Sequence, residues 1–210
     1  MTNPVCAVSV DLDPIGCYYG IHGLGAPPAA LADVVLRRGL PRFLELLSRR
    51  NLKATFFVVG MDLDPEAGPA GREVLREAAR AGHELGNHSH THRYEMSRLA
   101  QDQLYAEIDR AHDRITEVAG EPPVGFRAPG YTITDEVFSV LRELGIEYDS
   151  SVFPCPTYFA AKSAAIVKIA AAGRVSRSVV DDPRVLVAPT TPYRVGEPYW
   201  KRGDGLLELP

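Results

Sequence analysis

Three histidines within five residues are the part of the sequence best suited to metal chemistry. They are His88, His90 and His92, in the segment His88-Ser-His-Thr-His92. Two imidazoles four residues apart can reach one ion from a helical turn or a tight loop, and imidazoles two residues apart can do so from an extended strand. The spacing therefore predicts a metal site but leaves open which two of the three bind. The alternative is a histidine-rich loop exposed to solvent.

Two carboxylates near the amino terminus could complete such a site. Asp11 and Asp13 follow a short apolar segment, with Leu12 between them. One carboxylate can bind a divalent ion together with two imidazoles, which leaves positions for water and substrate, while the other accepts a proton. Water bound to such an ion has its pKa lowered toward ~7 and becomes a nucleophile at neutral pH. The alternative is a pair of aspartates that only cap a loop.

One arginine is placed to orient a carboxylate. Arg127 lies in the segment Phe126-Arg-Ala-Pro-Gly-Tyr131, where the proline and glycine predict a turn directly after it. An arginine paired with Asp11 would hold that carboxylate in a fixed orientation. A surface arginine before a turn is the alternative.

Seven segments that favour strands are predicted to position these residues. Short apolar, β-branched runs bounded by turn residues are typical of buried strands. The predicted strands are Val5–Leu12, Lys53–Val59, His83–Asn87, Val124–Arg127, Ile146–Asp149, Arg184–Ala188 and Leu206–Leu209.

Helical patterns alternate with these strands. The predicted helices are Leu40–Asn51, Gly71–Ala81, Ser97–Ala119, Thr134–Leu144 and Ala160–Ala172. Residues Asp13–Pro28 and Gly196–Gly205 are expected to be loops because they are rich in glycine and other turn residues. Alternation of strands and helices predicts βαβ units and a parallel sheet. Seven strands in a chain of this length favour an α/β fold with barrel-like closure.

The candidate residues fall where such a fold carries its chemistry, at the carboxyl ends of strands. Asp11 and Asp13 end the first predicted strand, the histidines follow the third, Arg127 ends the fourth and Asp149 ends the fifth. Four separate segments therefore bring charged or metal-binding groups to one rim of the sheet.

Composition argues against several classes of function. The 210 residues suggest one domain, and 45% apolar with 24% charged residues is typical of globular proteins. The net charge of −4, with no cluster of Lys and Arg, argues against nucleic-acid binding. No apolar run approaches the ~20 residues of a membrane span, and the amino terminus has no basic, apolar signal pattern. Three widely spaced cysteines predict no disulfide framework, so we expect a cytoplasmic protein.

Taken in order, three motifs resemble those of the NodB-like polysaccharide deacetylases, carbohydrate esterase family four. They are Ser9-Val-Asp-Leu-Asp13, His88-Ser-His-Thr-His92 and Arg127-Ala-Pro-Gly130. The resemblance spans about residues 5–149. It implies a distorted (β/α)7 barrel and a metal-dependent hydrolase that removes an acetyl or similar acyl group from an N-acylated amino sugar. It also implies Zn²⁺, or another divalent ion such as Co²⁺, Mn²⁺ or Fe²⁺.

The resemblance implies a role for each matched residue. Asp13, His88 and His92 would bind the metal, Asp11 would be the general base, and Arg127 would orient Asp11.

Residues next to the third motif are expected to contact the substrate. The resemblance implies that the backbone N–H of Gly130 stabilises the oxyanion. Tyr131 and Asp149 are predicted to line the substrate side of the rim. The substrate is expected to be a carbohydrate or a small-molecule amide, and the protein could form a homo-oligomer.

The sequence departs from the family pattern at several positions. Leu12 separates two aspartates that are usually adjacent, as in a branch resembling cytoplasmic peptidoglycan-deacetylase-like proteins, and Arg93 replaces a usual proline. The family's late histidine, a general acid, has no counterpart because no histidine follows His112. The sequence ends at Leu207-Glu-Leu-Pro210, which resembles the family's penultimate motif. We therefore expect a carboxyl terminus that lacks the last strand–helix unit.

Three other functions fit part of the pattern. A cyclic amide or ureide hydrolase of the allantoinase kind would use the same chemistry. A catalytically inactive fragment that binds metal or sugar would explain the missing late histidine. An iron oxygenase can use two histidines and one carboxylate, but the Arg127 motif fits hydrolysis better.

Overall fold

A mostly parallel sheet forms the centre of the molecule. The computed structural model describes residues 6–67, 69–180 and 182–210. Within them, seven strands form one sheet in the order β1-β2-β3-β4-β5-β7-β6. All neighbouring strands are parallel except β6 and β7, which are antiparallel. The strands are β1 (Ser9–Asp11), β2 (Thr55–Val58), β3 (Glu84–Asn87), β4 (Gly125–Phe126), β5 (Tyr148–Asp149), β6 (Tyr193–Val195) and β7 (Arg202–Glu208).

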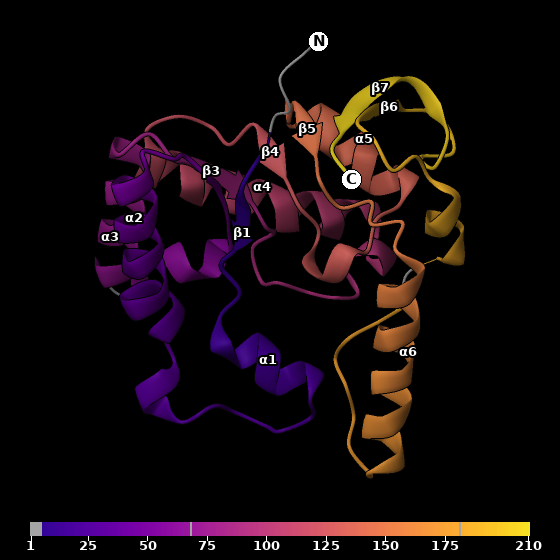
Figure 1. Cartoon of the computed structure of the whole chain (residues 1–210), viewed down its shortest axis with the longest axis horizontal. Helices are drawn as coiled ribbons and strands as arrows, with labels where there is room; N and C mark the ends of the chain where they lie inside the picture. The colour runs from indigo at the N-terminus through magenta and orange to yellow at the C-terminus, as the bar shows by residue number, and fades with distance from the viewer. Residues whose placement is uncertain (1–5, 68, 181) are drawn as a thin grey trace.

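Helices connect the parallel strands, as the alternating pattern predicted. They are α1 (Ile15–Ile21), α2 (Leu40–Arg50), α3 (Pro69–Arg80), α4 (Gln101–Ala119), α5 (Asp135–Glu143) and α6 (Pro156–Ala171). Shorter helical turns are η1 (Ala29–Leu31), η2 (Val35–Gly39), η3 (Gly60–Leu63), η4 (Pro65–Ala67), η5 (Met96–Arg98), η6 (Pro129–Tyr131) and η7 (Pro183–Val187). Figure 1 shows α2 beside α3, and α1 and α6 extending below the sheet on the side toward which β1 runs.

The long helix α4 links the two halves of the core. Its apolar residues recur every three or four positions, so one stripe of the helix faces the sheet. Leu104 and Ile108 belong to a cluster with Phe126 of β4, and Ile115 belongs to a second cluster with Phe56 of β2. All five of these side chains are buried. Packing on α4 therefore fixes both groups of strands relative to one another.

Most predicted elements are confirmed with shifted ends. Thr134 caps α5 as predicted, because its Oγ1 accepts a hydrogen bond from Val137 N at 3.4 Å. Helix α6 begins at Pro156, four residues before the predicted start, since proline suits the first position of a helix. Helix α4 begins at Gln101, after the separate turn η5. The first strand is only β1, and Val5, where it was expected to begin, lies outside the described residues.

Three predictions were wrong. The expected loop Asp13–Pro28 contains helix α1. The expected strand Arg184–Ala188 is mostly the helical turn η7, which starts at a proline and is capped by Asp182. The expected loop Gly196–Gly205 contains the first half of β7, which pairs with the unpredicted strand β6.

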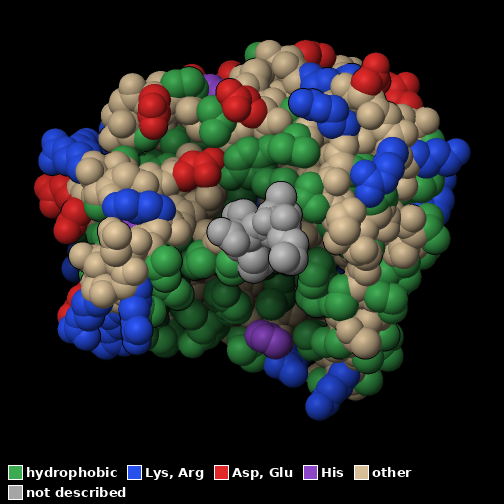
Figure 2. Space-filling model, turned by 45° about the horizontal axis from the view of Figure 1, so that its top comes forward, with side chains coloured by type: hydrophobic (Ala, Val, Ile, Leu, Met, Phe, Trp, Pro, Cys, Tyr) green, Lys and Arg blue, Asp and Glu red, His purple; other side chains and the backbone are tan. Residues whose placement is uncertain are grey.

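The surface in Figure 2 carries charged side chains of both signs around its edge and apolar side chains toward its middle. Neither sign gathers into a single patch on this face. Among the described residues, no helix is both long and apolar enough to cross a membrane.

Candidate active site

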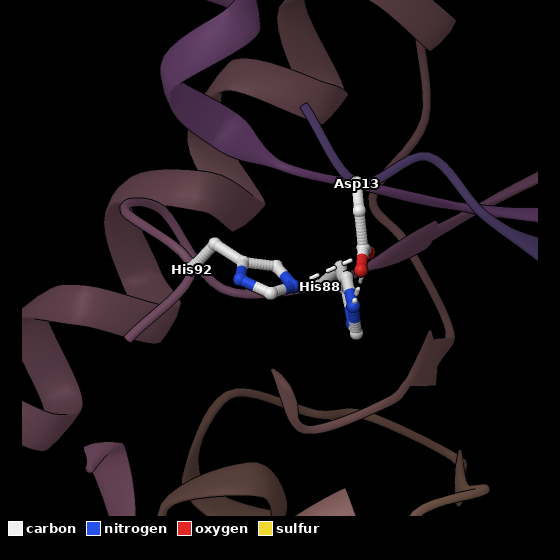
Figure 3. Close-up of side chains that lie close together, drawn as sticks. All are labelled: Asp13, His88 and His92. Carbon is white, nitrogen blue, oxygen red and sulfur yellow. Dashed lines mark ion pairs between the residues drawn. The ribbon is translucent and has the colours of Figure 1, made fainter. Parts of the chain in front are cut away.

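Asp13, His88 and His92 converge at the carboxyl ends of β1 and β3. Figure 3 shows the three side chains pointing toward one another, Asp13 from the segment after β1 and the histidines from the loop after β3. Asp13 Oδ1 lies 3.2 Å from His88 Nε2 and 3.2 Å from His92 Nε2. The ligand atoms of the three residues all lie within 4.8 Å of one another. The arrangement can hold a divalent ion with two nitrogen ligands and one oxygen ligand.

The backbone fixes the orientation of His88. Its Nδ1 lies 2.6 Å from the carbonyl oxygen of Arg127. A carbonyl only accepts hydrogen bonds, so Nδ1 carries the proton and the Nε2 of the neutral ring presents a lone pair toward Asp13. Metal-binding histidines generally make such a contact through their second nitrogen.

The electrostatics also suit a cation. Burial raises the pKa of Asp13, but the neighbouring imidazoles of His88 and His92 outweigh burial and hold the pKa of this carboxyl well below its usual range. Asp13 Oδ1 and His92 Nε2 are buried, and neither makes a hydrogen bond of acceptable geometry within the described chain. Buried polar atoms usually have partners, so these facing atoms fit a bound ion. Metal binding here would displace protons from the imidazoles.

A tight loop after β3 presents His88 and His92 to one point. Ser89 and His92 both have positive φ angles, 63° and 54°. The turn is held by Asn87, whose Oδ1 accepts from Ser89 N at 2.8 Å and whose Nδ2 donates to Ile108 O at 2.9 Å. Ser89 Oγ in turn accepts from His92 N at 3.1 Å. Helix α4 therefore anchors the metal-binding loop through the Asn87 side chain.

His90 points away from the other two histidines. Its Nε2 lies 3.2 Å from Asp64 Oδ2, and Asp64 also pairs with Arg110 and Arg114 of α4. The spacing of the three histidines did not predict which two bind the metal. The structure brings His88 and His92 together and places His90 in this separate ion-pair group.

Asp11 lies beside the metal triad and is held by Arg127. Arg127 Nη1 donates to Asp11 Oδ1 at 2.7 Å. The same guanidinium donates to Ser150 O and Oγ at 3.0 and 2.8 Å and lies over the ring of Phe57, 4.2 Å from its centroid. These contacts leave the arginine little freedom, so the position of the Asp11 carboxylate is fixed as well.

The turn after Arg127 requires glycine at one position. Gly130 has φ +64°, and a Cβ there would lie 2.7 Å from the ring of Tyr94. Lys162 of α6 donates to the Gly130 carbonyl at 2.8 Å. Tyr94 in turn packs edge-on against His92, with ring centroids 4.9 Å apart. The Gly130 backbone is thus held next to the metal triad.

The two predicted substrate residues differ in their accessibility. The ring of Tyr131 lies 5.9 Å from the guanidinium carbon of Arg127, near the site. Asp149 is fully buried and accepts hydrogen bonds from Ser151 N and Oγ at 3.0 and 2.6 Å. The structure therefore places Asp149 beneath the rim, where it orders the segment that holds Arg127, rather than at the surface.

Sequence reasoning missed the supporting roles of several residues near the site. Ser150 and Ser151 anchor Arg127 and the Ala128 amide, and small polar residues in a loop gave no signal of this. Burial raises the pKa of Asp62, on η3, to about 7, while the charge of His92 lowers it and that of Asp13 raises it. Asp62 adds negative charge near the triad whenever it is ionised.

Comparison with known proteins gives one family and several relatives. A family model described as "Polysaccharide deacetylase" matches residues 31–148, more than half of the chain. A peptidoglycan deacetylase of Helicobacter pylori is 25% identical over 148 residues, which cover 70% of this chain and 48% of the relative. A peptidoglycan-N-acetylglucosamine deacetylase of Bacillus cereus is 31% identical over 107 residues, 51% of this chain and 47% of the relative. The chain thus spans about half the length of these curated relatives.

Solved structures confirm the predicted fold class. A polysaccharide deacetylase-like protein from Mycobacterium smegmatis matches 97% of this chain and 57% of its own, with a TM-score of 0.66 and 25% identity. A family 4 carbohydrate esterase from Streptomyces lividans matches 70% of this chain and 62% of its own, with a TM-score of 0.51 and 23% identity. The α/β fold with a mostly parallel sheet is therefore that of a distorted NodB-like barrel.

Proposed function

Because the chain belongs to the polysaccharide deacetylase family, we propose that it hydrolyses the amide bond of an N-acylated amino sugar and releases acetate or a similar small acid. The observation that carries the proposal is the convergence of Asp13, His88 and His92 beside the pair of Asp11 and Arg127. Asp11 and Asp13 precede the residues that the family model matches, so their membership in the site rests on the structure.

Asp13, His88 and His92 would hold the ion, and Zn²⁺ suits two nitrogen ligands and one oxygen ligand, as do Co²⁺, Mn²⁺ and Fe²⁺. A divalent ion supplies Lewis acidity, which lowers the pKa of a bound water and polarises the acyl carbonyl. Metal identity is part of the test.

The chain's own residues would transfer the proton and stabilise the negative charge that develops during the reaction. Asp11 accepts the proton of the attacking water, and Arg127 keeps the Asp11 carboxylate aimed at that water. The water oxygen bonds to the acyl carbon, the C–N bond breaks, and the amine leaves with the proton that Asp11 accepted from the water. The Gly130 N–H donates to the oxyanion that develops on the acyl oxygen. Its backbone is held by the hydrogen bond from Lys162, and the Tyr94 ring leaves no room for a side chain at this position.

Metal or sugar binding without hydrolysis is a second candidate, because within residues 1–210 no histidine follows His112 to act as proton donor to the leaving amine. Acetate release from N-acetylglucosamine oligomers tests both candidates. A chelator removes bound metal from the chain, which is then reloaded with Zn²⁺, Co²⁺, Mn²⁺ or Fe²⁺, and NMR follows the release of acetate. Asp11→Asn is the matched control. Allantoin, a cyclic ureide, is tested as an alternative substrate.

Metal-dependent acetate release that Asp11→Asn abolishes supports the proposal. Hydrolysis of allantoin alone would make the chain a ureide hydrolase instead. A chain that binds metal and oligomer but turns over neither compound is a binding protein.

A further inference from the structure

Two segments that are far apart in the sequence form a projection on one side of the sheet. Residues 14–32 contain α1, and residues 150–180 contain α6. Figure 1 shows both helices extending below the sheet, on the side toward which β1 runs. The backbone N–H of Arg177 donates to the carbonyl of Gly20 at 3.2 Å, which ties one segment to the other. We call these two segments together the projection.

The projection differs in charge from the rest of the chain. Its 19 and 31 residues contain no Asp or Glu and four Lys and Arg, so its formal charge is +4. The whole chain has a net charge of −4, and the remainder therefore carries −8. Lys162 donates to the Gly130 carbonyl beside the active site. The other basic residues lie in or after the last turn of α6, and they are Lys168, Arg174 and Arg177.

Exposed apolar side chains are concentrated on the same projection. Among the described residues, 14 large apolar side chains are exposed, and seven of them belong to the projection, which holds only 50 of the 210 residues. Helix α6 buries only the side chain of Ile169. Val167 is 68% exposed, Val175 is 82% exposed and Leu24 is 53% exposed. Single exposed apolar residues are common on proteins, whereas a concentration of them marks an interaction site.

The positive charge and the exposed apolar side chains meet where α6 ends, which Figure 1 shows far below the sheet. The carbonyl of Ile169 accepts from the N–H of Arg174 at 3.1 Å, which folds the chain back onto the helix end. Gly23 follows α1, and a Cβ there would lie 2.8 Å from the carbonyl oxygen of Val175. The two segments are therefore in close contact at this end. The surface that we call the cationic tip consists of Leu24, Val167, Lys168, Arg174 and Val175.

A surface with exposed aliphatic side chains, basic side chains and no acidic ones suits a membrane that contains anionic lipids. Aliphatic side chains can enter the boundary between lipid headgroups and acyl chains, while Lys and Arg stay at the headgroups. The negative potential of such a membrane attracts the cationic tip and repels the acidic remainder of the chain, which favours one orientation. Nucleic acids fit less well, because single strands are bound through aromatic stacking and the tip presents leucine and valine.

We propose that the cationic tip binds the surface of membranes that contain anionic lipids. Helix α1 begins two residues after Asp13, so a chain bound in this way would hold the metal triad on the side of the sheet nearer the lipid. The proposal does not depend on the proposed function, because it concerns attachment to lipid and not turnover of a sugar.

Sedimentation with phosphatidylcholine vesicles, with and without ~30% phosphatidylglycerol, tests the proposal. We expect the chain to bind the vesicles that contain phosphatidylglycerol, and to bind them less at about 0.5 M salt than at about 0.1 M. Lys168→Gln/Arg174→Gln should weaken this binding by about 25-fold, since each basic residue near an anionic surface contributes about five-fold. Leu24→Ser/Val175→Ser should weaken it by about ten-fold, because two aliphatic side chains no longer enter the lipid.

Each double variant has a matched control outside the projection. Arg42→Gln/Arg80→Gln removes the same charge from exposed positions of α2 and α3. Leu46→Ser/Val187→Ser removes one leucine and one valine whose side chains are 53% and 72% exposed. Both controls should bind the vesicles like the wild type, and circular dichroism checks that every variant is folded.

A wild-type chain that does not bind vesicles with phosphatidylglycerol would overturn the proposal, and so would equal losses in the tip variants and their controls. Equal binding to vesicles with and without phosphatidylglycerol would also overturn it, because the basic residues would then have no role. A tip that docks a nucleic acid or another protein instead would leave the wild type unbound to vesicles. Since no sugar is present, none of these results bears on the acetate-release test of the proposed function.

Discussion

The carbonyl oxygen of Arg127 lies 2.6 Å from Nδ1 of His88, although 39 residues separate the two in the chain. The side chain of the same arginine binds Asp11. The backbone of Arg127 therefore sets the orientation of a predicted metal ligand, and its guanidinium sets that of the predicted general base. This division of roles allows metal binding and catalysis to be separated by mutation.

Metal binding is expected to depend on His88 and His92 but not on His90. We predict that His88→Gln and His92→Gln each weaken Zn²⁺ binding by at least about 100-fold. Even the loss of a residue that only hydrogen-bonds to a metal ligand lowers metal affinity by about 10- to 100-fold. His90→Gln should bind Zn²⁺ like the wild type, because His90 contacts Asp64 instead. Competition with a chromogenic chelator and elemental mass spectrometry measure this. Equal Zn²⁺ content in all three variants would refute the ligand assignment.

Arg127→Lys should lower kcat and leave the affinity for the metal unchanged. Lysine keeps the charge but cannot make the forked contacts to Asp11 and Ser150. We expect kcat on an N-acetylglucosamine oligomer to fall by about 100-fold, the effect of a misplaced reacting group. Zn²⁺ affinity should stay the same, because the backbone carbonyl that contacts His88 remains. A large loss of Zn²⁺ affinity in this variant would show that the side chain supports the metal site itself.

Stability should fall as the pH rises, because of the buried pair Asp149 and Glu208. Burial raises the pKa of Glu208 well above its usual value, and the charge of Asp149 raises it further, while the charge of Arg127 lowers it. Burial also raises the pKa of Asp149. The folded chain thus retains a proton that the unfolded chain releases above its ordinary pKa of about 4.3. This contribution to stability is complete below that pH and is lost as the pH rises toward the folded-state pKa.

Glu208→Gln cannot release this proton, so its free energy of unfolding should change less between pH 5 and pH 8 than that of the wild type. A pKa that is higher by one in the folded chain than in the unfolded chain corresponds to about 1.4 kcal/mol. Urea unfolding at the two pH values measures the difference, and Glu73→Gln, at an exposed position of α3, is the control. A pH dependence equal in the wild type and both variants would contradict this account.

Shortening a buried side chain of α4 should lower the free energy of unfolding. Ile108 is fully buried between the helix and β4, and its carbonyl accepts the Asn87 hydrogen bond. Ile108→Ala is expected to lower the free energy of unfolding by about 2–5 kcal/mol, since it removes buried volume. Tyr105→Ala, at an exposed position of the same helix, should change it by less than about 0.5 kcal/mol. Urea unfolding monitored by circular dichroism checks both, and equal losses would argue against this packing.

The first five strands could be predicted from the sequence, whereas β6 and the first half of β7 could not. An apolar run with aromatic and β-branched residues marked β2, because this strand is mostly buried. The first half of β7 is exposed and glycine-rich, so it shows no apolar pattern, and it is a strand only because β6 pairs with it. Conversely, the apolar run Arg184–Ala188 favoured a strand, but Pro183 and the Asp182 cap begin a helical turn there.

The sequence by itself determined which segments reach one edge of the sheet, because parallel strands bring their carboxyl ends to the same edge. Asp13, His88 and Arg127 could be placed at one rim on that ground alone. The tertiary structure decided their orientation. Spacing could not choose among the three histidines, and the choice rests on the positive φ angles of Ser89 and His92.

Only the tertiary structure could set those angles, because they depend on Asn87 and its hydrogen bond to helix α4. The burial of Asp149 and the meeting of Tyr131, Phe153 and Tyr158 are likewise results of packing between distant segments. Local patterns in a sequence carry strand and helix periodicity, whereas the direction of a side chain depends on contacts that form only when the chain folds.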